Sequence, residues 1–327
     1  MTISLFKLPT VVIHDILEYI GQVDTFNIYR SSSFASRNLK YLRPADKHFR
    51  LSIDLKNYEI HFMGVHYFTV KEYPAKQDPT VLLENKAFGD VHVKLHERDS
   101  KYTDIYCNPA QKNQVVRKIG DHFIKRFGIE TADQLFFPNN KFSAETIEWI
   151  CNLNLTWTSV WACGGSENPT DPTYARLFDD GFLRCVTGLF VAEFPVPQNF
   201  MPTNFLRSPL NLSTFSLDHA HWITKEHLLC MNFPRVNLSK SKLTVKEISE
   251  CFNNWKEGRE FNWTQLNIIM ADDRELDIEK IAEGISQPNQ IAMIGRNKTV
   301  TFKCSNDKMI RITLNADKLR LKCEYLG

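Results

Sequence analysis

The sequence lacks long hydrophobic runs, a basic leader and any marked excess of one charge. No window approaches the roughly 18 uninterrupted apolar residues that cross a membrane. The apolar stretch from Val11 to Ile20 is interrupted by charged residues and follows no basic segment, so it does not fit a secretory signal. Forty Lys plus Arg against 38 Asp plus Glu leave a net charge of +2, and no basic cluster indicates nucleic-acid binding. We therefore expect an intracellular protein of the cytoplasm or nucleus, with neither a membrane nor a nucleic acid as partner.

The sequence also lacks cysteines and histidines at the spacing of metal ligands. The eight cysteines are scattered, and no two of them have the spacing of a zinc site, so we expect reduced, buried thiols. Two histidine pairs lack a carboxylate or cysteine placed to complete a site: His92 with His96, and His219 with His221. We predict no metal and no cofactor.

No motif supplies an activated nucleophile or a phosphate-binding loop. Gly164-Gly165-Ser166 has neither the strand-to-helix elbow of a serine hydrolase nor the lysine of a phosphate loop. The carboxylate pairs Asp179-Asp180 and Asp272-Asp273 fall in expected turns, where solvated acids are usual. We therefore expect no catalytic residue. A hydrolase whose His and Asp residues only the fold assembles is the weakest alternative.

What the sequence does have, at its start, is a small amphipathic helical module. Apolar residues recur at the i, i+3, i+4 and i+7 positions of one helix face: Ile13, Ile16, Leu17 and Ile20. Gly21 follows where a helix would stop. A module of about 40 residues cannot bury its own apolar face, so it packs on the rest of the chain or docks on another protein.

The order of these residues resembles an F-box. Leu8-Pro9 opens the first helix, Ile16-Leu17 lie in its body, and residues 24–26 and 32–37 lead into two further helices. The tryptophan that many F-boxes carry in the third helix is absent, and Phe34 is the nearest bulky aromatic. The resemblance implies that the module binds a Skp-family adaptor and, through it, a cullin. The implied contacting or supporting residues are Leu8, Pro9, Ile13, Ile16, Leu17 and Ile20.

Alternating apolar and polar residues between Phe49 and Cys107 predict an antiparallel β-meander. Asn108-Pro109 then provides a helix cap and a first-turn proline, and the apolar stripe that follows predicts a helix over residues 109–127, ending at Gly128.

Beyond Gly128 the sequence alternates short strands with short capped helices, as in successive βαβ units. The spacing of about 20 to 30 residues favours an irregular leucine-rich-repeat-like sheet. The expected strands are near Gln134–Phe137, Ser159–Cys163, Cys185–Val191, Leu212–Leu217, Arg235–Leu238 and Gln265–Met270. The expected helices are capped by Ser143, by Thr224, and by Thr244 with Glu247 as a capping box.

The last segment returns to alternation, which predicts a three-stranded meander closing one end of the sheet. The expected fold class is thus α+β: a small helical F-box, then a mixed domain with β-meander segments and a βα-repeat sheet. The expected domains are an F-box at 3–46, a β-rich segment at 47–110, a βα-repeat domain at 111–286 and a closing β-meander at 287–327.

The strongest family signal is an ordered series of residues between 221 and 269. The series comprises Trp222-Ile223-Thr224, Leu228-Leu229, Asn232, Leu238, Ser241, Leu243-Thr244, Trp255-Lys256-x-Gly258 and Leu266. It is similar to the type 2 F-box-associated domain of nematode F-box proteins. Three features depart from that pattern: Phe233 replaces a usual cysteine, His219-Ala220-His221 replaces the usual lead-in, and a proline after the glycine is missing.

That resemblance implies a non-catalytic substrate-recognition adaptor of a Skp-cullin-F-box ubiquitin ligase, with a protein substrate held by the C-terminal domain. An F-box interaction scaffold that does not promote ubiquitin transfer is the alternative. From the residues alone, Trp222 and Trp255 are expected to be structural, Trp255 because it shares the apolar stripe of its helix.

We expect a substrate to bind the exposed sheet face and strand-end loops of residues 150–270, including Gly164–Thr173 and Pro195–Pro209. Phe200 and Phe205 lie in the second of these segments, where no helix or strand is expected to bury them. The alternative is that they cover the edge of the core beneath a long loop.

Overall fold

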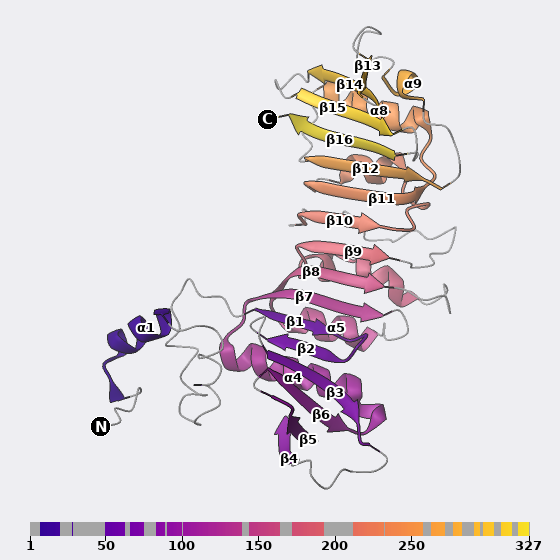
Figure 1. Cartoon of the computed structure of the whole chain (residues 1–327). Helices are drawn as coiled ribbons and strands as arrows, with labels where there is room; N and C mark the ends of the chain where they lie inside the picture. The colour runs from indigo at the N-terminus through magenta and orange to yellow at the C-terminus, as the bar shows by residue number, and fades with distance from the viewer. Residues whose placement is uncertain are drawn as a thin grey trace. The chain divides into compact units, whose positions relative to one another are not determined.

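Two compact units make up the chain: residues 1–137 with 152–158, and residues 138–151 with 159–327. The computed structural model, shown in Figure 1, describes residues 7–19, 28, 50–62, 66–74, 83–88, 90–99, 101–138, 144–163, 172–192, 212–231, 233–257, 263–271, 277–282, 291–294, 297–303, 309–315 and 320–326. Among these residues no helix is long and apolar enough to cross a membrane.

The first unit contains helix α1 (Thr10–Tyr19) and a sheet in the order β7-β1-β2-β3-β6-β5-β4. Its strands are β1 (Leu51–Asp54), β2 (Glu59–Phe62), β3 (His66–Glu72), β4 (Glu84–Phe88), β5 (Val91–Glu97), β6 (Tyr102–Cys107) and β7 (Thr131–Pro138). Strands β1, β2 and β3 form the expected antiparallel meander. The meander does not continue, because β3 pairs in parallel with β6, and β5 and β4 follow beyond it. Alternation reports which face a side chain occupies and not which strand is the neighbour, so this reordering left no trace in the pattern.

One face of this sheet is covered by helix α4 (Lys112–Phe127), preceded by a short 3-10 turn, η2 (Pro109–Gln111). The Asn108 side chain accepts from Ala110 N, and Gly128 closes the helix at φ 59°, as predicted. Phe123 stacks on Phe62 with ring centroids 4.6 Å apart. The core of this unit therefore lies between α4 and the strands.

The second unit has a sheet in the order β13-β14-β15-β16-β12-β11-β10-β9-β8. Its strands are β8 (Thr156–Cys163), β9 (Gly188–Ala192), β10 (Thr214–Leu217), β11 (Arg235–Ser241), β12 (Gln265–Met270), β13 (Ile291–Ile294), β14 (Asn297–Lys303), β15 (Met309–Asn315) and β16 (Arg320–Leu326). Strands β8 to β12 are parallel, and β16 pairs antiparallel with β12 to begin the closing meander. The meander has one strand more than expected, since β13 pairs with β14.

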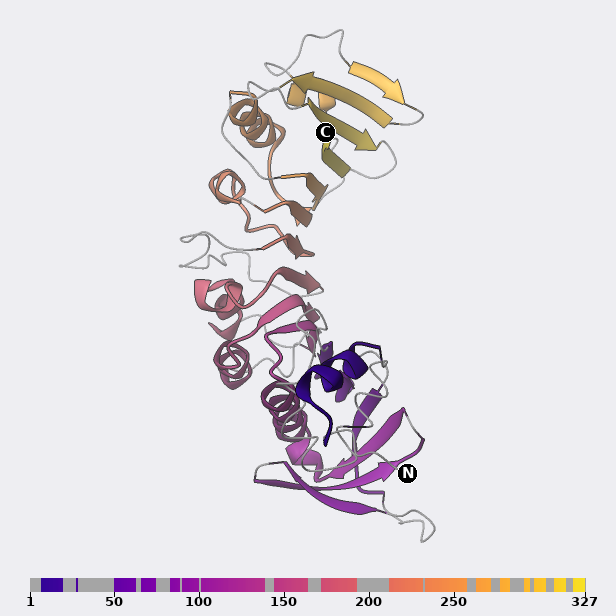
Figure 2. The ribbon, with the colours of Figure 1, turned by 90° about the vertical axis from the view of Figure 1, so that its left-hand side faces the viewer.

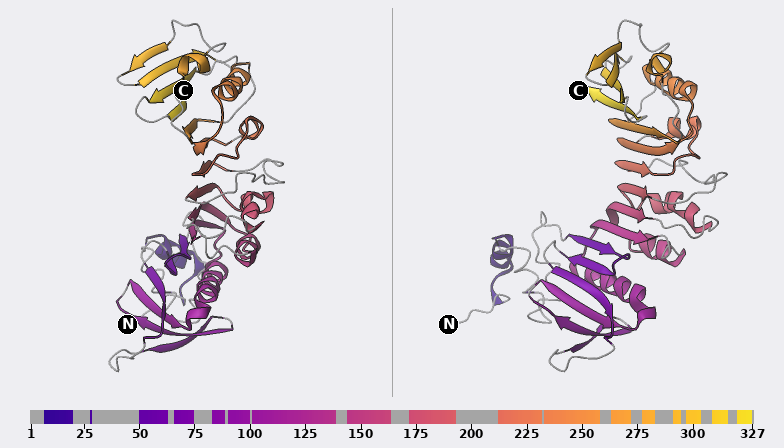
Figure 3. Two further views of the ribbon diagram at one scale, coloured as in Figure 1. Left: turned by 90° about the vertical axis from the view of Figure 1, so that its right-hand side faces the viewer. Right: turned by 45° about the vertical axis from the view of Figure 1, so that its right-hand side comes forward.

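Helices of the second unit all lie on one face of strands β8 to β12 within the described residues (Figures 2 and 3). The helical elements are α5 (Ala144–Asn152), η4 (Pro172–Phe178), α6 (Asp180–Leu183), α7 (Lys225–Cys230), α8 (Val245–Lys256) and α9 (Ile278–Ala282). The expected turn at Asp179-Asp180 is wrong, because Asp179 is the N-cap of helix α6 and Asp180 its first residue. Since α6 occupies the residues up to Leu183, strand β9 begins at Gly188 rather than near Cys185. Residues Asp272-Asp273 and the expected cap Ser143 lie outside the described residues.

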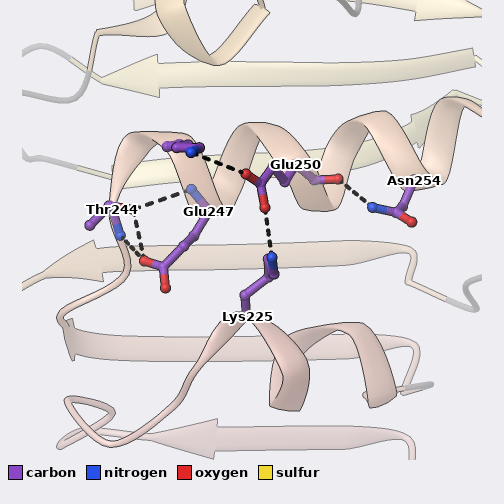
Figure 4. Close-up of polar contacts among 6 residues, drawn as sticks. Lys225, Thr244, Glu247, Glu250 and Asn254 are labelled. Carbon is purple, nitrogen blue, oxygen red and sulfur yellow. Dashed lines mark hydrogen bonds and ion pairs between the residues drawn. The ribbon is translucent and has the colours of Figure 1, made fainter.

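Local hydrogen bonds start the helices where the sequence predicts. Thr224 accepts from His227 N at the start of α7. At the start of α8, Glu247 Oε2 accepts from Thr244 N at 2.7 Å, and Thr244 Oγ1 accepts from Glu247 N at 3.2 Å (Figure 4). Lys225 donates to Glu250 Oε2 at 2.7 Å, which ties α7 to α8 and lowers the pKa of Glu250. Helix α8 therefore begins at a capping box, and Glu250, three residues beyond Glu247, joins it to α7.

The described chain is thus a mixed α/β protein whose body is mostly sheet. Of the helical F-box expected at 3–46, the structure describes helix α1, while the two further helices expected after Asp24 lie outside the described residues, apart from Ile28. The expected domain boundaries stay a prediction.

Candidate functional site

The candidate site is the face of strands β8 to β12 opposite the helices. Apolar side chains that point toward the helices are fully buried, among them Val160, Leu189 and Phe215. The residues between them alternate onto the other face, where no helix lies within the described part of the second unit (Figure 2). Among the described residues, the partly exposed side chains of this face are therefore the candidates for contact with a partner.

Five residues of this face form one continuous row. The strand registers place them opposite one another in the order Trp161, Phe190, Ser216, Asn237 and Asn267. Neighbouring strands lie about 4.8 Å apart, so such a row spans roughly 19 Å across the sheet. The row changes from aromatic at β8 and β9 to polar at β11 and β12.

The aromatic end of the row is a stacked pair. The rings of Trp161 and Phe190 have centroids 4.2 Å apart and an interplanar angle of 7°. Both residues are only partly buried, so the pair presents apolar surface to solvent. Large aromatic side chains of this kind contribute most of the binding energy at many protein interfaces.

The polar end of the row is an amide pair. Asn267 Nδ2 donates to Asn237 Oδ1 at 2.5 Å. Asn267 is 3% exposed, and its own Oδ1 has no hydrogen-bond partner among the described residues. The hydrogen bond fixes the orientation of two amides on neighbouring strands.

Strand β11 ends at an irregularity beside this face. Lys240 has φ 52°, and the register of β11 against β12 shifts between Leu238 and Ser241. The shift lets Lys240 Nζ donate to His219 Nε2 at 2.9 Å. Burial and the nearby Lys240 charge both lower the pKa of His219.

The histidine pairs are not part of any larger ligand cluster. Within the described residues no group of three His, Cys, Asp or Glu side chains is placed to hold a metal. The rings of His219 and His221 lie 6.5 Å apart in the segment after β10, although two histidines at this spacing would share one face if the segment were a strand. His92 and His96 share one face of strand β5, as alternation predicts.

The cysteines differ from the expectation of buried thiols. Burial is described for six cysteines, and only Cys107 and Cys251 are buried. The others are partly or fully exposed: Cys151, Cys163, Cys185 and Cys230. These four cysteines lie at or near the ends of helices and strands, where side chains are less buried. The composition of the sequence does not reveal such positions.

The residues that the F-box resemblance implies for adaptor binding are described in part. In and before α1, Ile13 is 4% exposed, Leu8 and Ile16 are partly buried, and Pro9 is exposed. Leu17 lies in the helix, while its side chain and all of Ile20 lie outside the described set. The helix also presents Val11, which is 70% exposed. The role of these residues stays a prediction.

The expected substrate residues Phe200 and Phe205 lie outside the described residues, as do the segment 195–209 and residues 164–171 of the other loop. Trp222 is 4% exposed and packs edge-on against Phe178, with centroids 5.2 Å apart, so its expected structural role is confirmed. The Trp255 side chain lies outside the described set.

Sequence reasoning predicted the face but missed the row. Trp161 and Phe190 are separated by about one repeat in sequence, and their contact depends on the register of β8 against β9. The available signal was their position out of phase with the buried residues of each strand.

One segment of this sheet is similar to a known protein family. Residues 197–268 match the family described as F-box associated. These residues include β10, α7, β11, α8 and the start of β12, which is the part of the sheet that carries the polar end of the row.

One characterised relative is the Skn-1 dependent zygotic transcript 15 protein of Caenorhabditis elegans. It is 24% identical over 199 residues, which cover 58% of this chain and 54% of that protein. The chain thus spans about half the length of the curated relative it matches. No solved structure matches the chain. Both matches confirm the resemblance inferred from the sequence: the chain is similar to nematode F-box-associated proteins.

Proposed function

We propose that the protein is the substrate-recognition adaptor of a Skp-cullin-F-box ubiquitin ligase. The observation that carries the proposal is the uncovered strand face of the second unit, with its Trp161–Phe190 stack, formed in part by the F-box-associated residues 197–268. A face of this kind holds a protein partner and leaves the chemistry to other subunits.

The contribution of such a receptor to ubiquitin transfer is positional. It holds a substrate lysine close to the charged ubiquitin carrier, which turns an encounter between separate molecules into an effectively intramolecular reaction. The receptor therefore needs binding surfaces and no nucleophile of its own.

The adaptor half of the proposal rests on α1 and the residues just before it. An exposed apolar side chain on a short helix, as at Val11 of α1, favours docking on another protein. Burying each aliphatic side chain at such an interface contributes roughly 1.5 to 3 kcal/mol. A charge at its centre removes more than about 2 kcal/mol of binding free energy, or about thirtyfold in affinity.

The test is affinity purification of the full chain under proteasome inhibition, which reports adaptor and substrate together. The variants Ile16→Glu and Leu17→Asp are expected to abolish recovery of the Skp-family adaptor and cullin. Asp15→Asn, an exposed change on the same helix, is the matched control and is expected to recover both. Undiminished adaptor recovery by both charged variants would contradict the proposal. Ubiquitin transfer to the recovered substrate distinguishes a ligase receptor from a scaffold.

A further inference from the structure

The first unit has a second strand face, opposite α4, that no described helix covers and whose composition differs from that of the face in the second unit. Alternation along β3, β5 and β6 brings aromatic and basic side chains to it. The set, which we call the tyrosine face, comprises Tyr67, Lys71, Tyr73, Lys94, Arg98, Tyr102, Asp104 and Tyr106. None of these residues belongs to the F-box-associated match at 197–268.

One half of the tyrosine face is a stacked pair under a guanidinium group. The rings of Tyr67 and Tyr102 have centroids 5.0 Å apart at an angle of 17°. Arg98 Cζ lies 5.1 Å from the centroid of Tyr102, which is itself 38% exposed. The ring fixes the position of the cation and keeps it at the surface.

The other half repeats this arrangement with a lysine. Tyr73 and Tyr106 stack with centroids 6.5 Å apart, and Lys94 Nζ lies 5.7 Å from the centroid of Tyr73. Tyr73 is 45% exposed although it is a large aromatic residue. Exposed aromatic surface beside fixed cations is typical of interface hot spots.

Asp104 lies between the two halves and holds the cations in place. Its side chain is 4% exposed, with Oδ2 2.9 Å from Lys71 Nζ and Oδ1 3.2 Å from Arg98 Nε. The side chains of Lys71 and Arg98 are still 41% and 43% exposed. On the uncovered face of these three strands, the charges that reach solvent within the described residues are therefore all basic, while the single carboxylate is buried beneath them.

We propose that the tyrosine face binds an extended acidic segment of a protein partner. Its carboxylates pair with Lys94, Lys71 and the outward edge of Arg98, and its apolar side chains lie on the Tyr67–Tyr102 stack. The guanidinium group has five N–H donors, so its contact with Asp104 leaves others for a second carboxylate. This proposal stands whether or not the second unit recognises a ligase substrate.

Fluorescence anisotropy of the full chain with a labelled peptide of alternating glutamate and tyrosine tests this assignment. The same peptide with glutamine in place of glutamate is expected to bind at least about tenfold more weakly, and the affinity for the acidic peptide is expected to fall as salt is raised. The double variant Lys94→Ala with Arg98→Ala is expected to lose about tenfold in affinity for the acidic peptide. Lys125→Ala, an exposed change on α4, is the matched control and is expected to bind as the wild type does.

A second pair of variants separates binding from folding. Tyr102→Ala is expected to weaken binding of the acidic peptide, while Tyr102→Phe is expected to retain the ring stack and the affinity. Equal affinity for the glutamate and glutamine peptides, or unchanged binding by the double variant, would overturn the proposal. Tighter binding of a single-stranded RNA oligonucleotide than of the acidic peptide would also overturn it, because the face would then be a nucleic-acid surface.

Discussion

At the scale of single residues, two neighbouring thiols of the second unit differ in acidity because one donates a hydrogen bond to the other. The hydrogen bond from Cys151 lowers the pKa of Cys185 to about 7, and the same contact raises the pKa of Cys151. Burial raises the pKa of Cys251 to about 12. Of these three thiols, Cys185 therefore has the largest thiolate fraction near pH 7.

We predict that iodoacetamide at pH 7 modifies Cys185 at least about tenfold faster than Cys251, since the thiolate is the reactive form. Mass spectrometry of timed, quenched samples measures both rates in one protein. Removing the donor with Cys151→Ala is expected to raise the pKa of Cys185 and slow its modification. Equal rates at Cys185 and Cys251 would show that this contact does not set the acidity.

At the scale of elements, the capping box of α8 allows a direct stability measurement. Thr244→Ala removes the hydroxyl that accepts from Glu247 N and donates to Glu247 Oε2 (Figure 4). Loss of such a cap costs about 1 kcal/mol of unfolding free energy, or a fall of about 2 to 4 °C in melting temperature. Thr244→Ser keeps the hydroxyl and is expected to melt close to the wild type. A Thr244→Ala protein as stable as the serine variant would mean that the cap contributes nothing.

Helix boundaries were predictable from the sequence because their causes are local. Thr244 and Glu247 lie three residues apart, and Gly128 ends α4 through its own backbone conformation. The neighbour of β3 was not predictable, because β6 enters between β3 and β5 through contacts distant in sequence. The same limit applies to the candidate site. The alternation in sequence places Trp161 and Phe190 on the less buried side of their strands, but only the register of β8 against β9 brings the two rings together.

At the scale of the whole molecule, the two units offer different binding surfaces. The second unit has an aromatic-to-amide row on a parallel sheet, and the first has tyrosines with basic side chains. Each surface can be mutated separately, because the residues of the row and those of the tyrosine face lie on different strands.

The central claim is that the uncovered strand face of the second unit holds a protein substrate, and the double variant Trp161→Ala with Phe190→Ala tests it most directly. Partners recovered with the full chain under proteasome inhibition are identified and quantified by mass spectrometry. The matched control is Lys246→Ala, because the Lys246 side chain is 86% exposed and lies on helix α8, away from this strand face.

We predict that the double variant recovers the Skp-family adaptor as the wild type does but loses the substrate by at least about tenfold, as expected for removal of a central aromatic anchor. Its circular dichroism is expected to match that of the wild type, and Lys246→Ala is expected to recover both partners. Substrate recovery by the double variant equal to that of the wild type would contradict the account.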